Sequence, residues 1–269
     1  MIHKDIPMGD AVLRTYVLSN YTEIDLERRR AFIVICPGGA YRFCSNREAE
    51  SVAIRFNSLG YNCAVLFYST NHEPYNEANS YSRLFPKPQD ELASAVAYVR
   101  ENSREMNADP DRIVVMGFSA GGHLAASLGT MWPSYGEVSK PNALVLCYPV
   151  ITSGPLAHVE SIRRLIGGDD SLLDKVSLER QVTKDTPPSF IWTTRDDGSV
   201  PCGNSLLFAQ ALERNGVPFE LKMYEKGRHG LSLGTCEVYG TLPPETPCDV
   251  QDWPERVDAF LMGLFGSRF

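Results

Sequence analysis

The stretch Gly117-Phe118-Ser119-Ala120-Gly121-Gly122 decides the fold. Residues 112–116 before it form an apolar, β-branched run typical of a strand, and residues 123–129 after it have helical spacing. A serine on so tight a strand-to-helix turn needs small neighbours, because strand and helix approach closely there. Glycine stands two residues to either side of Ser119, so we interpret this serine as a nucleophile. A glycine-rich turn that binds phosphate or only packs closely is the alternative.

The same alternation of strand and helix runs along the chain. Short β-branched or aromatic runs predict strands at residues 12–18, 31–36, 63–68, 112–116, 143–148, 189–194 and 219–224. Apolar residues at helical spacing lie between several of these runs. Most of the runs are apolar throughout, as strands covered on both faces must be. The sequence therefore predicts an α/β fold with a mostly parallel central sheet flanked by helices on both faces.

No repeat or low-complexity tract divides residues 1–269, so we predict a single domain. Two stretches, near 70–88 and 151–188, lack clear periodicity, and we interpret them as lid-like insertions that face substrate. The first contains Tyr75 and Tyr81, whose amphipathic rings suit a polar, sugar-accepting cleft better than a fatty chain.

Charge and composition exclude several classes of protein. The chain has 26 Lys and Arg against 33 Asp and Glu, a formal net charge of −7, so we expect no nucleic-acid partner. Its apolar runs are strand-sized, so we expect no membrane span. Residues 1–10 contain no apolar signal segment, which favours a cytoplasmic location. The seven cysteines include no CxxC pair, so we expect free thiols and no metal site.

A nucleophilic serine needs a base, and the chain offers five histidines. His229 follows the predicted strand 219–224, and ligands of open α/β sheets bind at such strand ends. His123 lies four residues after Ser119 on the same predicted helix, which suits a structural hydrogen bond better than proton transfer. We therefore assign the base to His229.

The base needs an acidic partner to fix its tautomer. Asp196 and Asp197 follow the predicted strand 189–194 in the same way that His229 follows its own strand. On spacing alone either aspartate can serve. A solvated acidic turn is the alternative interpretation of this pair.

The stretch Pro37-Gly38-Gly39-Ala40-Tyr41 closes the predicted strand 31–36. Small residues let its N–H groups approach a ligand, and such a loop forms an oxyanion hole together with the N–H of the residue after the nucleophile, Ala120. Tyr41 stands beside these donors, where it either limits the depth of the acyl group as a substrate-binding residue or packs into the core. Loop, Ser, Asp and His come from four different strand ends.

That order of elements resembles the α/β-hydrolase fold, and several stretches resemble its acetyl esterase group, which is related to bacterial acetylxylan and feruloyl esterases. The stretches that carry the resemblance are residues 36–41, 47–50, 117–128, 186–190, 196–201 and 229–234. The resemblance extends from about Phe32 to Leu264.

The resemblance implies a serine carboxylesterase that acts on short acyl esters, often acetyl groups on sugars or plant polysaccharide fragments, without a cofactor. It makes Asp196 the acid of a Ser-His-Asp triad. It also makes the N–H groups of Gly39, Ala40 and Ala120 the oxyanion donors, with Ala40 tolerated if its φ stays negative. We expect a small-molecule or oligosaccharide ester as substrate, and the sequence leaves open whether the protein is a homodimer.

Three rival functions remain. A peptidase of the prolyl-oligopeptidase type shares the fold and triad order, but the chain has no length for the large amino-terminal propeller of that family. A glycosidase needs two carboxylates about 5–9.5 Å apart and leaves the serine unexplained. A non-catalytic carbohydrate-binding homologue usually lacks one triad residue. We therefore expect a serine carboxylesterase.

Overall fold

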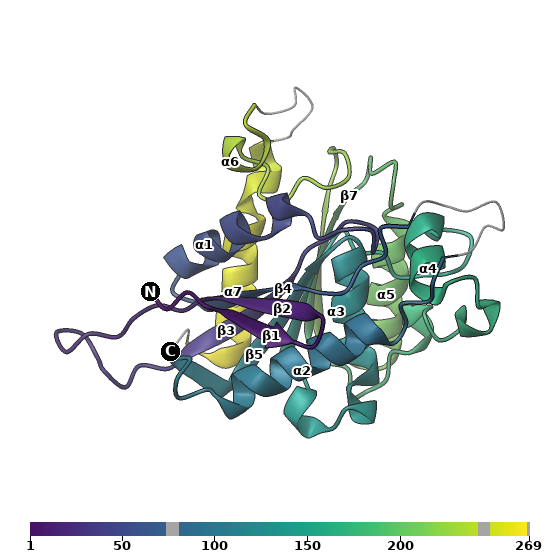
Figure 1. Ribbon diagram of the computed structural model, residues 1–269. Helices are drawn as coiled ribbons and strands as arrows, with labels where there is room; N and C mark the ends of the chain where they lie inside the picture. Colours follow the sequence, from purple (N-terminus) through teal and green to yellow (C-terminus); the bar gives the residue numbers. More distant parts are fainter. Residues whose placement is uncertain (74–80, 242–247, 268–269) are drawn as a thin grey trace.

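The computed structural model describes residues 1–73, 81–241 and 248–267, and its centre is one eight-stranded sheet (Figure 1). The strands are β1 (Asp5–Met8), β2 (Ala11–Tyr16), β3 (Arg30–Cys36), β4 (Asn62–Phe67), β5 (Ala108–Phe118), β6 (Ala143–Cys147), β7 (Ser189–Thr194) and β8 (Phe219–Tyr224). Their order in the sheet is β1-β2-β4-β3-β5-β6-β7-β8. The six strands from β3 to β8 are parallel to one another, and β2 pairs antiparallel with both β1 and β4. The predicted mostly parallel sheet is confirmed.

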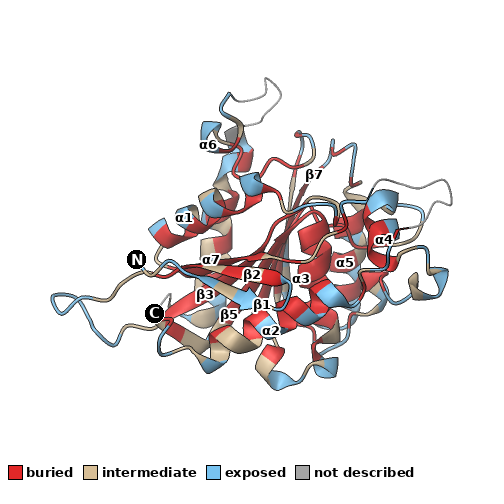
Figure 2. Ribbon diagram, viewed as in Figure 1, coloured by how far each residue is buried: buried red, intermediate tan, exposed pale blue. Residues whose placement is uncertain are grey.

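Helices cover both faces of the sheet, as predicted. They are α1 (Glu50–Ser58), α2 (Lys87–Glu101), α3 (Ala120–Met131), α4 (Val159–Ile166), α5 (Gly203–Arg214), α6 (Cys236–Tyr239) and α7 (Trp253–Phe265). Apolar residues of α2, α3, α4 and α5 pack into the core on one face, and those of α1 and α7 pack into a second core on the other. Strands β3 and β6 are buried along their whole length between the two cores (Figure 2). This two-sided burial explains why these runs carry no polar alternation.

Strand β1 and helix α4 are among the elements that the sequence analysis did not predict. The four-residue strand β1 is absent from the prediction, since it is a half-exposed edge strand that contains Pro7. Helix α4 lies in the stretch 151–188, where eight residues are too few to show clear periodicity. This stretch also contains two short 3₁₀ turns, and Ile151, Leu165 and Val176 from it are buried in the core.

The other predicted insertion, 70–88, contacts α4 through Arg164. Residues 74–80, with Tyr75, lie outside the described residues. Tyr81 is buried, and the guanidinium of Arg164 on α4 lies 4.3 Å from its ring centroid. The same guanidinium donates to the carbonyl of Asn71 at 2.8 Å. The expectation that Tyr81 faces a cleft is wrong, because its ring packs against a buried arginine.

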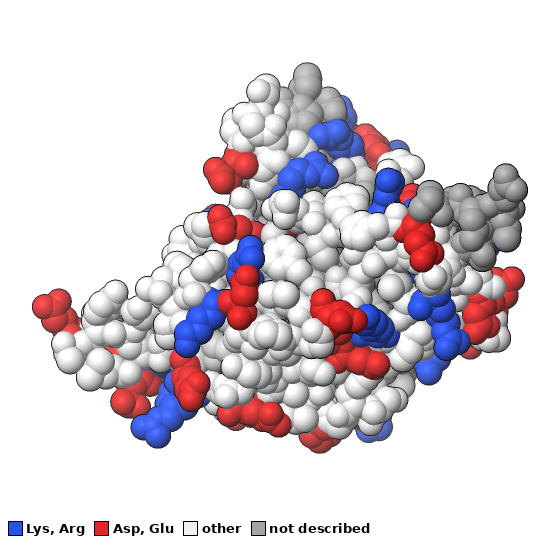
Figure 3. Space-filling model, viewed as in Figure 1, with Lys and Arg blue, Asp and Glu red and all other residues white. Residues whose placement is uncertain are grey.

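Acidic and basic side chains are interspersed over the face of the molecule seen in Figure 3. Across the ranges 1–73, 81–241 and 248–267, no helix combines the length and the apolar character needed to cross a membrane.

The turn between β5 and α3 leaves no room for side chains at two glycines. A Cβ on Gly117 would lie 2.1 Å from the carbonyl oxygen of Gly121. A Cβ on Gly121 would lie 2.1 Å from the carbonyl oxygen of Cys36, at the end of β3. Both clashes are with backbone atoms, so a larger residue would push α3 away from the sheet.

We expect Gly121→Ala to lower the free energy of unfolding by at least about 2 kcal/mol, because the backbone must move to admit the methyl group. The matched control is Gly263→Ala in α7, where a Cβ meets nothing within 4 Å. That change should raise stability by about 0.5–1 kcal/mol through helix propensity. Urea unfolding of both variants measures the difference, and equal stabilities would contradict the close approach.

Candidate active site

Ser119 stands at the carboxyl edge of the sheet in a strained backbone conformation, with φ 54° and ψ −118°. Two neighbours hold it there. Its N–H donates to the carbonyl of Cys147 at 3.0 Å, and its own carbonyl accepts from the N–H of Val150 at 3.0 Å. A non-glycine residue at positive φ costs about 1–3 kcal/mol and persists where the surroundings dictate it. Here the strain turns the hydroxyl out of the strand and toward the adjacent loops.

The side chains of Ser119, His229 and Asp197 form a continuous hydrogen-bonded chain. The Ser119 Oγ lies 2.7 Å from His229 Nε2, and His229 Nδ1 lies 2.6 Å from Asp197 Oδ2. The Asp197 side chain is fully buried, and its other oxygen accepts from the N–H groups of Ser199 at 2.9 Å and Val200 at 2.8 Å. Since a carboxylate only accepts, Nδ1 carries the proton and Nε2 is free to accept the serine proton.

The structure corrects the predicted acid. Asp196 is exposed, whereas Asp197 is the residue that contacts His229. The physical reason is the direction of the chain after β7: the turn brings the Asp197 carboxylate back over the N–H groups two and three residues ahead of it. Aspartate favours such a turn at either position, so the sequence does not show which of the two carboxylates contacts the histidine.

The loop after β3 runs through three consecutive residues at positive φ: Gly39 at 129°, Ala40 at 55° and Tyr41 at 57°. The expectation of a negative φ at Ala40 is therefore wrong. Gly39 and Ala40 line the cavity beside Ser119. Ala120 is the first residue of α3, where a backbone N–H has no acceptor within the helix. Oxyanion holes are built from backbone N–H groups such as these.

A buried carboxylate that the sequence analysis missed holds this loop. Glu48 Oε2 accepts from the N–H of Gly38 at 2.7 Å, and Oε1 accepts from the hydroxyl of Tyr148 at 2.6 Å. The Tyr148 hydroxyl in turn accepts from the N–H of Ser232 at 2.9 Å, and its ring packs edge-on against His229. Burial raises the pKa of Glu48, and the bonds from Tyr148 and Gly38 act against that rise. Glu48 thus connects the loop after β3 to the loop that carries the base.

Tyr41 does not line the cavity. Its side chain is fully buried, and its hydroxyl lies 2.9 Å from His123 Nδ1. His123 Nε2 lies 2.9 Å from the carbonyl of Val176, so Nε2 carries the proton and Nδ1 accepts from the tyrosine. Burial lowers the pKa of His123 to about 4, which keeps this ring neutral. Tyr41 is thus an anchor of the loop rather than a substrate-binding residue, because positive φ turns its side chain inward.

The cavity over Ser119 has a volume of about 250 Å³. It is lined by Gly39, Ala40, Phe43, Ser45, Arg47, Glu48, Ser119, His158, Glu160, Ser199, His229 and Gly230. Within the part of the chain that the structure describes, no group of three His, Cys, Asp or Glu side chains could hold a metal ion.

Comparisons with known proteins agree with this geometry. The profile of the alpha/beta hydrolase fold family matches residues 80–233, and a profile named BD-FAE matches residues 21–136. The solved structure of an acetyl ester-xyloside bifunctional hydrolase from Caldicellulosiruptor lactoaceticus is 33% identical, with a TM-score of 0.81, and the match covers 97% of this chain and 96% of that one.

Two curated relatives are longer than this chain. The chain is 37% identical over 221 residues to endo-1,4-beta-xylanase B of Butyrivibrio fibrisolvens, which covers 78% of this chain and 34% of that protein. It is 30% identical over 216 residues to an acetylxylan esterase of Xylanibacter ruminicola, which covers 77% of this chain and 42% of that protein. The chain thus spans well under half the length of these two relatives.

The chain belongs to the alpha/beta hydrolase fold family. The resemblance to the acetyl esterase group is confirmed by the acetylxylan esterase and acetyl ester-xyloside hydrolase matches.

We expect Asp197→Asn to lower kcat for p-nitrophenyl acetate by roughly 10⁴-fold, because an amide beside Nδ1 selects the wrong tautomer of His229. The neighbouring Asp196→Asn is the matched control, and its kcat should stay within about twofold of the wild type. Steady-state kinetics of the two variants decide between the aspartates. Inverted effects would return the role to Asp196.

Because the pKa of His123 is lowered in the folded protein, we expect the free energy of unfolding to depend on pH. Unfolded histidine titrates near 6.5 and folded His123 near 4, so between these values the unfolded state binds the extra proton. The free energy of unfolding should therefore fall as pH drops from 6.5 to 4, by up to about 3 kcal/mol from this group. Denaturant unfolding at several pH values measures this decrease in the free energy of unfolding. The contribution of His123 should be absent in His123→Gln and present in the control His72→Gln, which changes an exposed residue. An identical fall in wild type and His123→Gln would refute the assignment.

Proposed function

We propose that the protein is a serine carboxylesterase that removes short acyl groups, acetyl above all, from carbohydrate-derived esters. One observation carries the proposal: the unbroken chain from Ser119 Oγ through the His229 ring to the buried Asp197 carboxylate, with distances of 2.7 and 2.6 Å. A serine, a base and an orienting acid in this geometry activate a nucleophile for acyl transfer.

In the first half of the reaction, Ser119 Oγ attacks the ester carbonyl while His229 Nε2 takes its proton. Asp197 stabilises the imidazolium that forms. The N–H groups of Gly39, Ala40 and Ala120 stabilise the negative charge that develops on the carbonyl oxygen. His229 then gives the proton to the alcohol oxygen, and the C–O bond breaks to leave an acyl-serine.

In the second half, His229 Nε2 takes a proton from water, which attacks the acyl-serine. The tetrahedral intermediate collapses as His229 returns the proton to Ser119 Oγ, and the carboxylic acid product leaves. Glu48 supports both halves, because it holds Gly38 beside the oxyanion donors and, through Tyr148, the loop of the base.

The size and the lining of the cavity favour a substrate with a short acyl group and a hydroxyl-rich alcohol. Its volume of about 250 Å³ is below the usual range for drug-sized ligands, roughly 300–1,000 Å³. Phe43 is the one large apolar side chain among the residues that line it. The relatives named acetylxylan esterase and acetyl ester-xyloside hydrolase act by name on acetyl esters of xylan and on xylosides.

Glycosidase chemistry has less support at this site. Two carboxylates, Glu48 and Glu160, line the cavity. Both oxygens of Glu48 already accept hydrogen bonds from the protein, and its side chain is only 3% exposed. An acid or nucleophile in glycoside hydrolysis must instead reach the glycosidic oxygen or the anomeric carbon.

We expect Ser119→Ala to lower kcat/KM for p-nitrophenyl acetate and for acetylated xylo-oligosaccharides by about 10⁴-fold or more, while the melting temperature stays close to that of the wild type. A phosphonate probe should add its mass to the wild type and not to this variant. Ser94→Ala, an exposed serine on α2, is the control and should keep activity and labelling. Ester hydrolysis above a tenth of the wild-type rate in Ser119→Ala would contradict the proposal, and p-nitrophenyl xyloside turnover would then indicate a glycosidase.

A further inference from the structure

We propose that His158 determines specificity for the alcohol part of the substrate, by donating a hydrogen bond from Nε2 to a hydroxyl group, while Glu160 accepts one from a neighbouring hydroxyl. This inference rests on the proposed esterase function and deepens it. The alcohol it selects is a polyhydroxylated one, such as a sugar ring, over a simple aryl or alkyl alcohol.

The cap of α4 fixes which nitrogen of His158 carries the proton. His158 Nδ1 accepts from the N–H of Ser161 at 3.4 Å and lies 2.8 Å from the Ser161 hydroxyl. A ring nitrogen that accepts from a backbone N–H has no proton of its own, so the neutral ring holds its proton on Nε2. Burial lowers the pKa of His158 and the nearby His229 lowers it further, which favours this neutral form. His158 therefore presents a donor and not a charge.

His158 shares the cavity with the groups that would act on the alcohol part of the substrate. His158 and Glu160 line the cavity together with Ser119 and His229. The alcohol oxygen takes its proton from His229, so the alcohol part of the ester lies on this side of the serine. The carbonyl oxygen faces the loop of Gly39 instead.

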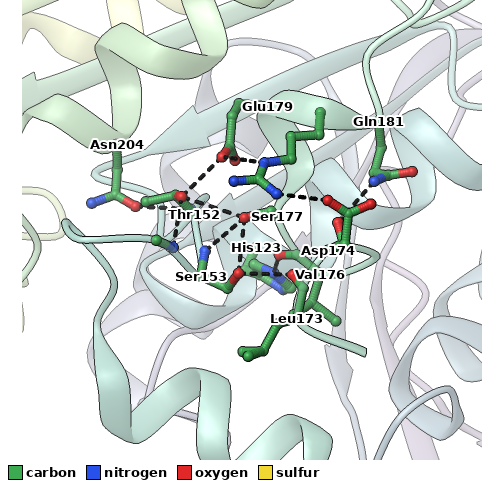
Figure 4. A network of polar contacts seen from close by, with 12 residues as sticks. His123, Thr152, Ser153, Leu173, Asp174, Val176, Ser177, Glu179, Gln181 and Asn204 are labelled. Atoms are coloured by element: carbon green, nitrogen blue, oxygen red, sulfur yellow. Dashed lines mark hydrogen bonds and ion pairs between the residues drawn. The ribbon is translucent and has the colours of Figure 1, made fainter. Parts of the chain in front are cut away.

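The segment that leads to His158 is anchored by hydrogen bonds, of which Figure 4 shows those of Thr152 and Ser153. Asn204 on α5 accepts from the N–H of Thr152 at 3.1 Å and donates to the carbonyl of Leu156 at 2.9 Å. The N–H of Ser153 donates to the hydroxyl of Ser177 at 3.0 Å. These buried contacts fix the backbone between β6 and His158, so the Nε2–H is preorganised rather than carried on a loop that must close.

Glu160 supplies the complementary acceptor. Its Oε1 accepts from Arg164 Nε at 3.1 Å, and Arg164 is itself held by the carbonyls of Asn71 and Glu73. The Glu160 side chain is 46% exposed at the mouth of the cavity. A hydroxyl group both donates and accepts, so a donor and a carboxylate side by side match two neighbouring hydroxyls better than they match an apolar ring.

The test compares two esters of acetate that differ in the alcohol, acetylated xylo-oligosaccharide and p-nitrophenyl acetate. His158→Asn keeps a good N-cap for α4 but is too short to place a donor where Nε2 stands. We expect the ratio of kcat/KM for the sugar ester to that for the aryl ester to fall by about tenfold or more, which corresponds to about 1.4 kcal/mol. Glu160→Gln should lower the same ratio, and the exposed-site control His72→Asn should leave it unchanged.

A binding measurement keeps the test independent of turnover. Calorimetric titration of unacetylated xylotriose should give a Kd at least about fivefold weaker for Ser119→Ala/His158→Asn than for Ser119→Ala alone. Unchanged ratios in His158→Asn and Glu160→Gln, or equal Kd values, would show that His158 only caps α4 and would overturn the inference. The proposed esterase function fails on a different result, retained activity in Ser119→Ala.

Discussion

The close approach of α3 to the ends of β3 and β5 is the constraint on which the site depends. Gly117 and Gly121 let the helix start against the carbonyl of Cys36, and backbone hydrogen bonds to Cys147 and Val150 hold Ser119 at positive φ. Once that turn is set, the nucleophile, the first N–H of α3 and the loop after β3 necessarily meet at one edge of the sheet. A parallel sheet brings the remaining loops to the same edge, because its strands all end there.

Buried polar contacts then align these loops with one another. Glu48 binds the loop after β3 and, through Tyr148, the loop of His229. The contact between the Tyr41 hydroxyl and His123 on α3 holds the same loop against that helix. Each group lies in the interior with its hydrogen bonds satisfied by a different element, so a shift of one loop would leave a buried polar atom unpaired. We infer that this network, more than the apolar cores, keeps the catalytic groups in register.

The sequence predicted most of the sheet, because strands buried on both faces carry an uninterrupted apolar signal, as β3 and β6 do. The approach of Ser119 to His229 was also predictable, since each follows a recognisable strand. The acid was not: Asp196 and Asp197 are adjacent, and only the turn after β7 decides which one reaches His229. Likewise, nothing in the sequence indicates that Tyr41 turns inward or that Glu48 is buried, because both depend on contacts with distant segments.

The most direct measurement of the central claim is proton NMR of the His229 Nδ1–H in ¹⁵N-histidine-labelled protein. A short bond to a buried carboxylate shifts this proton far downfield and protects it from exchange. We expect such a resonance in the wild type and in Asp196→Asn, and its loss in Asp197→Asn. A resonance that survives in Asp197→Asn, or disappears in Asp196→Asn, would contradict the hydrogen-bonded chain that positions the base.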